Sequence, residues 1–201
     1  IYTLLDDIVK YMPSPENKQV AGISMKNHEI FEANFDFAKP KSAYIFKTIV
    51  DPFIGKYSLI KVYSGVIKSD DVLYNLDKDV EEKVGKIYVL QGNKPIEVPE
   101  LHAGDIGALA KVTAARTGNT LSTKANTIQY GKAEISTPYT YMRYKVKNKS
   151  DIDKVSQSLQ KMMHEDLTLK AVNDAENKQM LLYGMGDKHL EIVVSRLLNE
   201  Y

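Results

Sequence analysis

The 201 residues carry 27 Lys and Arg against 26 Asp and Glu, so the formal net charge is only +1 and no global field favours nucleic acid. The chain has no Cys, which excludes disulfides and thiolate metal sites. No apolar run approaches the roughly 20 residues of a membrane helix, and no secretory signal is present, so we expect a cytoplasmic protein without a membrane partner.

Residues 1–41 are predicted to form one short helix followed by a linker. Apolar residues such as Leu4 and Ile8 recur at helical spacing over residues 3–11, and the Pro-Ser-Pro run at 13–15 stops the helix. The rest of the segment is polar apart from one apolar and aromatic stretch, which predicts a strand or two. The chain begins inside a helix pattern and without Met, so we expect a longer parent protein.

Residues 42–131 are predicted to form a small β-barrel. From Ser42 the apolar period is two, and β-branched or aromatic runs alternate with turn signals. A barrel is favoured over a sandwich because so many short strands must protect their edges. Aromatic side chains such as Tyr44 and Phe46 are expected in the core. The predicted strands are 43–50, 57–63, 72–74, 83–90, 106–112 and one from Thr120.

Residues 132–201 are predicted to form an α+β domain of order β-α-β-β-α. This order is that of a ferredoxin-like fold lacking its last strand. Ser150 and Asp153 have the spacing of a capping box, and Asp187 is expected to cap the second helix. The predicted elements are strands at 139–146, 168–172 and 180–183, a helix at 150–166 and a helix from Asp187.

No catalytic constellation or metal site is predicted. The phosphate-binding loop G-x-x-x-x-G-K-[ST] is missing. Residues 148–151 match the guanine-specificity motif N-K-x-D, but without a phosphate loop they are better explained as a turn and a helix cap. The four His residues are scattered, with no metal-ligand spacing. We therefore expect neither an enzyme nor a cofactor in this segment.

One charge pattern is relevant to nucleic acid. Arg143, Lys145 and Lys147 fall on one face of the predicted strand, since residues two apart share a face. A row of cations suits phosphate groups, each of which releases counterions when neutralised. The alternative is a solvated face of a half-buried strand, and the sequence leaves both open. The residues between and beside them are apolar or aromatic: Met142, Tyr144 and Val146.

Several blocks, in order along the chain, resemble the elongation factor G family of translational GTPases. The runs 51–56 and 61–65 are similar to D-P-x-x-G-R and R-V-Y-S-G of the family's domain II. Residues 184–192, GMGDKHLEI, resemble the G-M-G-E-L-H-L-E-I block of its domain III. Further similar blocks lie at 4–15, 103–108 and 117–121.

The resemblance implies a ribosome-binding translocation factor whose GTP and magnesium are bound by a domain absent from this chain. Domain II of the family docks on small-subunit RNA, and domain III links the GTPase to distal domains and touches a small-subunit protein. The fragment is expected to be monomeric and to contact other domains of its own chain. The implied ribosome-binding candidates are Lys56, Arg143, Lys145 and Lys147, and the interdomain candidates are Asp51, Phe53, Gly55, Met185, Asp187, Lys188 and His189.

The sequence also departs from the family pattern. Lys56 and Lys61 stand where Arg is usual, and Asp187-Lys188 replaces Glu-Leu, which favours a divergent paralogue. Two alternatives to a translocase stay open. One is a ribosomal protection or recycling factor of the same superfamily. The other is a stand-alone enzyme or RNA-binding protein.

Overall fold

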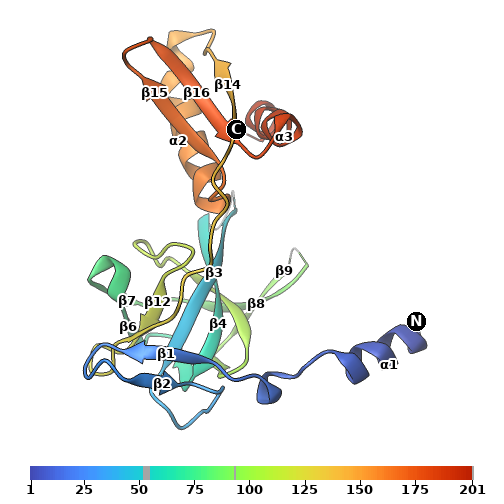
Figure 1. The fold of residues 1–201 in the computed structure, drawn as a ribbon, viewed down its shortest axis with the longest axis vertical. Coiled ribbons are helices and arrows are strands. Elements are labelled where there is room, and N and C mark those ends of the chain that lie inside the picture. The colour runs from blue at the N-terminus through green and yellow to red at the C-terminus, as the bar shows by residue number, and fades with distance from the viewer. Residues whose placement is uncertain (52–54, 93, 201) are drawn as a thin grey trace. The chain divides into compact units, whose positions relative to one another are not determined.

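The computed structural model describes residues 1–51, 55–92 and 94–200 (Figure 1). The chain divides into two compact units, Ile1–Lys132 and Ala133–Tyr201. Each unit buries its own hydrophobic cluster. The first unit is almost entirely β-structure, and the second combines three strands with two α-helices.

The first 41 residues form a helix and two strands. The predicted helix is confirmed as α1 (Tyr2–Tyr11), and Met12 is extended, as expected before a proline. The polar segment that follows pairs with the end of the first unit in a three-stranded sheet of order β13-β1-β2. The elements are η1 (Pro15–Asn17), β1 (Ala21–Ser24), β2 (Ile30–Glu32) and β13 (Ile128–Gln129).

An eight-stranded antiparallel sheet of order β7-β6-β12-β3-β4-β11-β8-β9 dominates the first unit. In the described residues no ladder joins β7 to β9, so hydrogen bonding leaves this sheet open. A separate ladder pairs β10 with β5. The strands are β3 (Ser42–Asp51), β4 (Gly55–Ser64), β5 (Val66–Lys68), β6 (Val72–Asn75), β7 (Val80–Lys83), β8 (Ile87–Gln91), β9 (Lys94–Val98), β10 (Glu100–His102), β11 (Ile106–Ala110) and β12 (Thr120–Ser122), with η2 at Leu76–Lys78.

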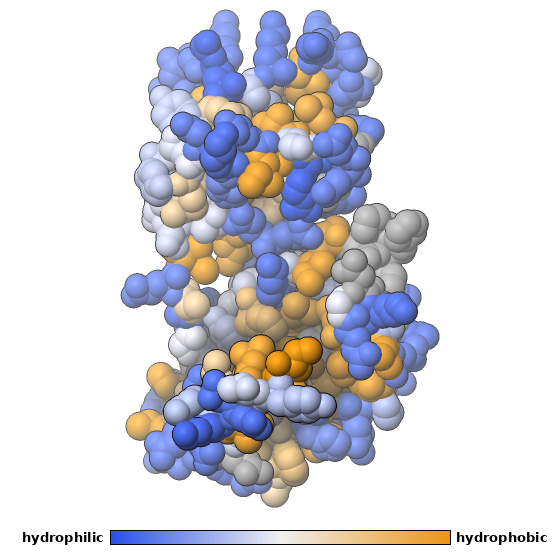
Figure 2. Space-filling model, turned by 90° about the vertical axis from the view of Figure 1, so that its right-hand side faces the viewer, coloured by the Kyte–Doolittle hydropathy of each residue, from blue (hydrophilic) through white to orange (hydrophobic). Residues whose placement is uncertain are grey.

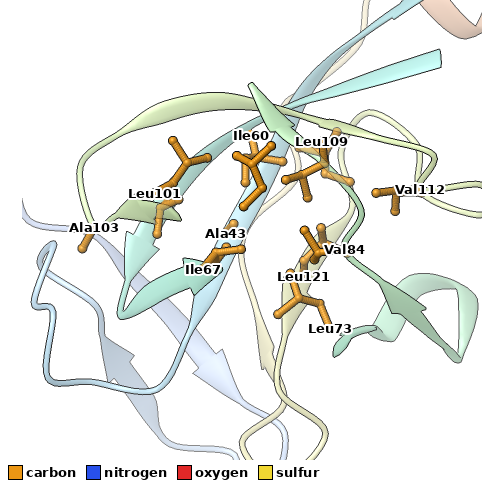
Figure 3. Packing of buried hydrophobic residues seen from close by; sticks show 14 of the residues in the cluster. Ala43, Ile60, Ile67, Leu73, Val84, Leu101, Ala103, Leu109, Val112 and Leu121 are labelled. Carbon is orange, nitrogen blue, oxygen red and sulfur yellow. The ribbon is translucent and has the colours of Figure 1, made fainter. Parts of the chain in front are cut away.

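These strands wrap around one core, which confirms the expected barrel-like architecture. Apolar side chains from most of them converge on a single cluster (Figure 3). Ile60 of β4, Leu109 of β11 and Leu121 of β12 are fully buried there although far apart in sequence. Burying such side chains stabilises each by about 1.5–3 kcal/mol relative to exposure.

Two details of the barrel differ from the sequence prediction. The register of β3 against β4 shifts between Ile45 and Lys47, so Phe46 occupies a bulge and is 41% exposed rather than in the core. The strand predicted at 83–90 is interrupted, because the backbone of Val84 bonds to the turn formed by Asp70 and Asp71 instead of extending a ladder.

The second unit has the predicted order β-α-β-β-α. Its antiparallel sheet runs β14-β16-β15, and both helices pack on one side of it, which confirms the expected ferredoxin-like arrangement (Figure 1). Leu159 and Met162 of the first helix and Leu190 of the second meet Leu182 of the central strand. The elements are β14 (Thr140–Tyr144), η3 (Lys149–Asp151), α2 (Ile152–Glu165), β15 (Lys170–Asp174), β16 (Gln179–Gly184) and α3 (Asp187–Asn199).

Both predicted helix caps are wrong. A turn of 3-10 helix precedes α2, whose cap position is Asp151 without a side-chain cap bond, and Ser150 bonds Asp151 instead. The cap position of α3 is Gly186, so Asp187 is its first residue. An acidic residue there is still favourable for the helix dipole.

The surface drawn in Figure 2 is mostly hydrophilic, with hydrophobic side chains exposed in small groups. That mixture is normal for a folded protein surface. Of the helices in the described residues, none is both long and apolar enough to cross a membrane.

Candidate functional site

The basic row of Arg143, Lys145 and Lys147 keeps its alternation in the structure. All three are exposed, whereas Met142 and Tyr144 are half-buried against the cluster beneath the helices. Burial raises the pKa of the Tyr144 hydroxyl. The strand β14 ends at Tyr144, earlier than predicted, yet exposure continues to alternate through Lys147.

The charges of this row are uncompensated. Of the residues that the structure describes, none forms an ion pair or side-chain hydrogen bond with Arg143, Lys145 or Lys147. Other cations are tied down: Lys41 lies 2.6 Å from Asp71, and Arg196 lies 3.1 Å from Glu165. A free exposed cation keeps its full charge for a phosphate or a carboxylate of a partner.

The predicted interdomain residues of the second unit meet at the start of α3. The backbone N–H of Met185 donates to Nδ1 of His189 at 3.0 Å, and Nε2 of His189 lies 2.9 Å from Oδ2 of Asp166. Because Nδ1 accepts, the proton of the neutral imidazole sits on Nε2 and is donated to the carboxylate. His189 therefore links α3 to the end of α2.

The surroundings of His189 at the start of α3 are tightly packed and partly charged. A Cβ on Gly184 would lie 2.7 Å from Cδ2 of Leu190 and 2.9 Å from Nδ1 of His189, so only glycine fits there. Burial raises the pKa of the Asp166 carboxyl, but hydrogen bonds from Thr168 and His189 outweigh it and lower the pKa overall. Lys188 points outward and pairs with Glu191 at 2.7 Å.

Lys56 of the first unit lies at the start of β4 and turns toward its own domain. Its Nζ donates to the backbone carbonyls of Thr113 and Ala115 at 3.0 and 2.6 Å. Burial, together with the charge of Arg116, lowers the pKa of Lys56 to about 8, although Glu82 opposes the shift. Lys56 thus holds the loop between β11 and β12.

The remaining candidates of the first unit sit where β3 meets β4. Asp51 and Gly55 are cross-strand partners, and Gly55 has a φ of +90°, a conformation that favours glycine. Phe53 lies outside the described residues. The structure therefore groups Asp51, Gly55 and Lys56 in one unit and the candidates from Arg143 to His189 in the other.

A groove of about 430 Å³ also lies on the first unit. Its walls include Phe35, Tyr63 and the bulged Phe46, and Nζ of Lys61 lies 5.5 Å from the centre of the Phe35 ring. That distance is a cation–π contact.

Two family models match this chain. Residues 40–124 match the model described as elongation factor G domain 2, and residues 135–201 match the one described as elongation factor G, domain III. Together the matches span most of the chain. The chain belongs to the elongation factor G family. Residues 40–124 thus correspond to domain II and residues 135–201 to domain III of that family, which is a translation-factor type of architecture.

A solved structure is similar to nearly the whole chain. A crystal structure of a protein from Thermus thermophilus superposes with a TM-score of 0.73 at 25% sequence identity. The match covers 98% of this chain and 27% of that protein. The chain thus spans about a quarter of the length of that protein.

Some residues of the site were not found from the sequence. Asp166, the partner of His189, is distant in sequence, and no local pattern predicts the contact. Glu82, whose Oε2 accepts from the N–H of Ala114, also gave no signal. Tyr141 could have been found from the sequence, because it lies two residues before Arg143 on the predicted strand and therefore shares its face.

Proposed function

We propose that this chain is the ribosome-binding and coupling segment of a cytoplasmic translational GTPase. GTP and magnesium are bound and GTP is hydrolysed by a domain outside this segment, and domains II and III transmit that change while they hold the ribosome. The assignment to the elongation factor G family supports the general role. The uncompensated row of Arg143, Lys145 and Lys147 is the observation that carries ribosome binding.

Phosphate binding explains why the row is unpaired. Arg143 lies on β14, and Lys145 and Lys147 follow the end of that strand with the same alternation of exposure. All three cations are exposed, while Tyr144 and Val146 between them are half-buried. Each phosphate contacted releases counterions, and the released ions drive association.

The helix α1 supports a coupling role. Leu4, Leu5 and Ile8 are 63%, 51% and 43% exposed, and α1 has no buried residue in the structure. An amphipathic helix normally buries its apolar stripe. We assign α1 to the end of the GTPase domain, whose surface covers this stripe in the parent protein.

Ribosome pelleting with the full-length factor tests the proposal. Lys145→Glu with Lys147→Glu should reduce the fraction that sediments with ribosomes. The matched control is Lys154→Glu with Lys178→Glu, which changes the net charge equally at two other exposed positions of the same unit. If both double variants sediment like the parent, the row is only a solvated face and the proposal fails.

A further inference from the structure

The side of the β14-β16-β15 sheet that carries no helix combines aromatic rings with Arg143, the first cation of the basic row. Tyr141 is paired in register with Tyr183, and the two ring centres lie 5.3 Å apart. Tyr183 is in turn paired with Lys170 of β15. Cross-strand partners share a face, so these residues lie on the same surface as Arg143.

The helices leave this surface open. The side chains packed against α2 and α3 include Met142, Leu182 and Ala171, which are mutual register partners on the opposite face. Tyr141 is 60% exposed. Leu181, the register partner of both Arg143 and Val172, lies on this face and is 8% exposed.

The surface is also positive. Among the described residues Lys170, like the three cations of the basic row, has no ion-pair or side-chain hydrogen-bond partner. The acidic side chain in register on this face is Asp174, which accepts from the N–H and Nδ2 of Asn177 at 3.1 and 2.8 Å. Its single negative charge is outnumbered by the charges of Lys170 and the basic row. The rings therefore lie on the same sheet face as the free cations Arg143 and Lys170, and Lys145 and Lys147 follow just beyond the end of β14.

We propose that this face binds single-stranded RNA, with an unpaired base stacked on Tyr141 and its phosphates held by Arg143, Lys145 and Lys147. The inference rests on the proposed ribosomal function and specifies which part of the RNA is recognised. A duplex offers only its backbone to a flat sheet, because its bases already stack on one another. An unpaired base has a free π-face, and stacking on an aromatic side chain accepts any base.

The ring pair suits stacking rather than simple packing. Contact with Tyr183 restrains the Tyr141 ring, so little conformational entropy is lost when a base lands on it. An acidic peptide would use the cations and would leave the exposed ring without a role. Charge and aromatic character together therefore select RNA over an acidic protein segment.

The test measures binding of the 201-residue chain to a fluorescent oligouridylate of about ten nucleotides, within the usual site size of single-strand binders. Tyr141→Leu should weaken binding about tenfold, since stacking one base contributes ~1–3 kcal/mol and 1.4 kcal/mol is tenfold. Tyr141→Phe keeps the ring and should bind within about twofold of the parent by the same reasoning. Tyr11→Leu, on exposed α1, is the matched control and should change nothing.

A polyphosphate chain without bases separates stacking from charge. Lys145→Gln with Lys147→Gln should weaken binding to both polymers, whereas Tyr141→Leu should affect the oligouridylate alone. The proposal is overturned if Tyr141→Leu binds oligouridylate like the parent, if it weakens both polymers equally, or if polyglutamate binds the parent as tightly as RNA does.

A second measurement uses the unmodified chain, so misfolding of a variant cannot obscure the result. Photocrosslinking of an oligomer containing 4-thiouridine should map to Tyr141 or Tyr183, and crosslinks confined to the first unit would contradict the proposal. Ribosome pelleting is scored separately. If the Lys145 and Lys147 variants sediment normally with ribosomes while Tyr141→Leu still weakens binding to oligouridylate, the proposed ribosomal function fails and the proposed RNA-binding surface is retained.

Discussion

Nε2 of His189 lies 2.9 Å from Oδ2 of Asp166, and this contact joins the first turn of α3 to the end of α2. Asp166 also accepts from the N–H and Oγ1 of Thr168 at 2.8 and 2.6 Å. The Asp166 carboxylate therefore orients both the turn that leads into β15 and the imidazole of His189. A family motif residue, His189, thus has a structural task within its own domain.

Replacing Asp166 should weaken the second unit. Asp166→Ala removes the acceptor of three hydrogen bonds, which should lower the free energy of unfolding by about 1–2 kcal/mol. Because the folded pKa of Asp166 is lowered, its stabilising effect is present above the unfolded pKa of about 3.9 and is lost as pH falls below that value. Urea unfolding of parent and variant from about pH 7 to pH 3 should show the two midpoints converging at low pH. Midpoints that stay equally separated would contradict the role assigned to the carboxylate.

Gly184 and Gly186 offer a matched pair of substitutions. Gly184→Ala would force a Cβ against Leu190 and His189, and such overpacking should cost about 1–3 kcal/mol. Gly186 has an extended φ of 165°, and no atom lies within 4 Å of the place that a Cβ would take, so Gly186→Ala should change stability by no more than about 0.5 kcal/mol. Thermal unfolding of both variants measures the difference. Equal effects would show that the junction is looser than the structure indicates.

Lys56 should make stability depend on pH in the alkaline range. Its folded pKa of about 8 lies below the unfolded value of about 10.4, so between these values the unfolded chain binds more protons. The free energy of unfolding should therefore rise with pH across that window, relative to Lys56→Met. Below about pH 8 both states of the lysine are protonated, and the two proteins should show parallel profiles. If the parent and Lys56→Met showed parallel profiles at every pH, the Lys56 amine would not be the cause of the alkaline rise in the free energy of unfolding.

Replacing Arg116 offers a second test of the lowered pKa of Lys56. Its charge contributes to the lowered pKa, so Arg116→Ala should raise the pKa of the amine and slow its acylation near about pH 8. Mass spectrometry after brief acetylation gives the rate at Lys56, with exposed Lys154 in the same sample as reference. An unchanged ratio of the two rates would leave burial as the sole cause of the shift.

Regular periodicity predicted most of the fold. The helix α1 and the face shared by Arg143, Lys145 and Lys147 followed from spacing alone, because side-chain direction in helices and strands is set by the backbone. Phe46 was wrongly predicted to lie in the core. A bulge shifts the in-and-out alternation of side chains by one residue, and whether a bulge forms depends on the partner strand. The pairing of β1 and β2 with β13 was not predictable, since such short strands carry almost no pattern.

The candidate site was predictable only in part. The sequence indicated the basic row, yet whether its charges are compensated depends on neighbours distant in sequence. Lys56 was expected to face the ribosome, whereas its bonds to Thr113 and Ala115 were not foreseen. Those bonds reflect how the loop after β11 folds back over β4, a tertiary arrangement that no local motif encodes.

The segment should not bind GTP by itself. It has no phosphate loop, which supplies the amides and the lysine that cradle the phosphates. Calorimetric titration of the 201-residue chain with GTP and magnesium should give no heat of binding. A micromolar dissociation constant, about 8 kcal/mol of binding free energy, would place a nucleotide site within domains II and III.

The salt dependence of ribosome binding tests the central claim most directly. The full-length factor is compared with its Lys145→Gln, Lys147→Gln variant and with the control Lys154→Gln, Lys178→Gln across a salt series. If Lys145 and Lys147 neutralise phosphates, the log–log slope of affinity against salt should become shallower by about 0.7–0.9 per lost contact, while the control keeps the slope of the parent. Three identical slopes would contradict the assignment of this basic row to ribosomal RNA.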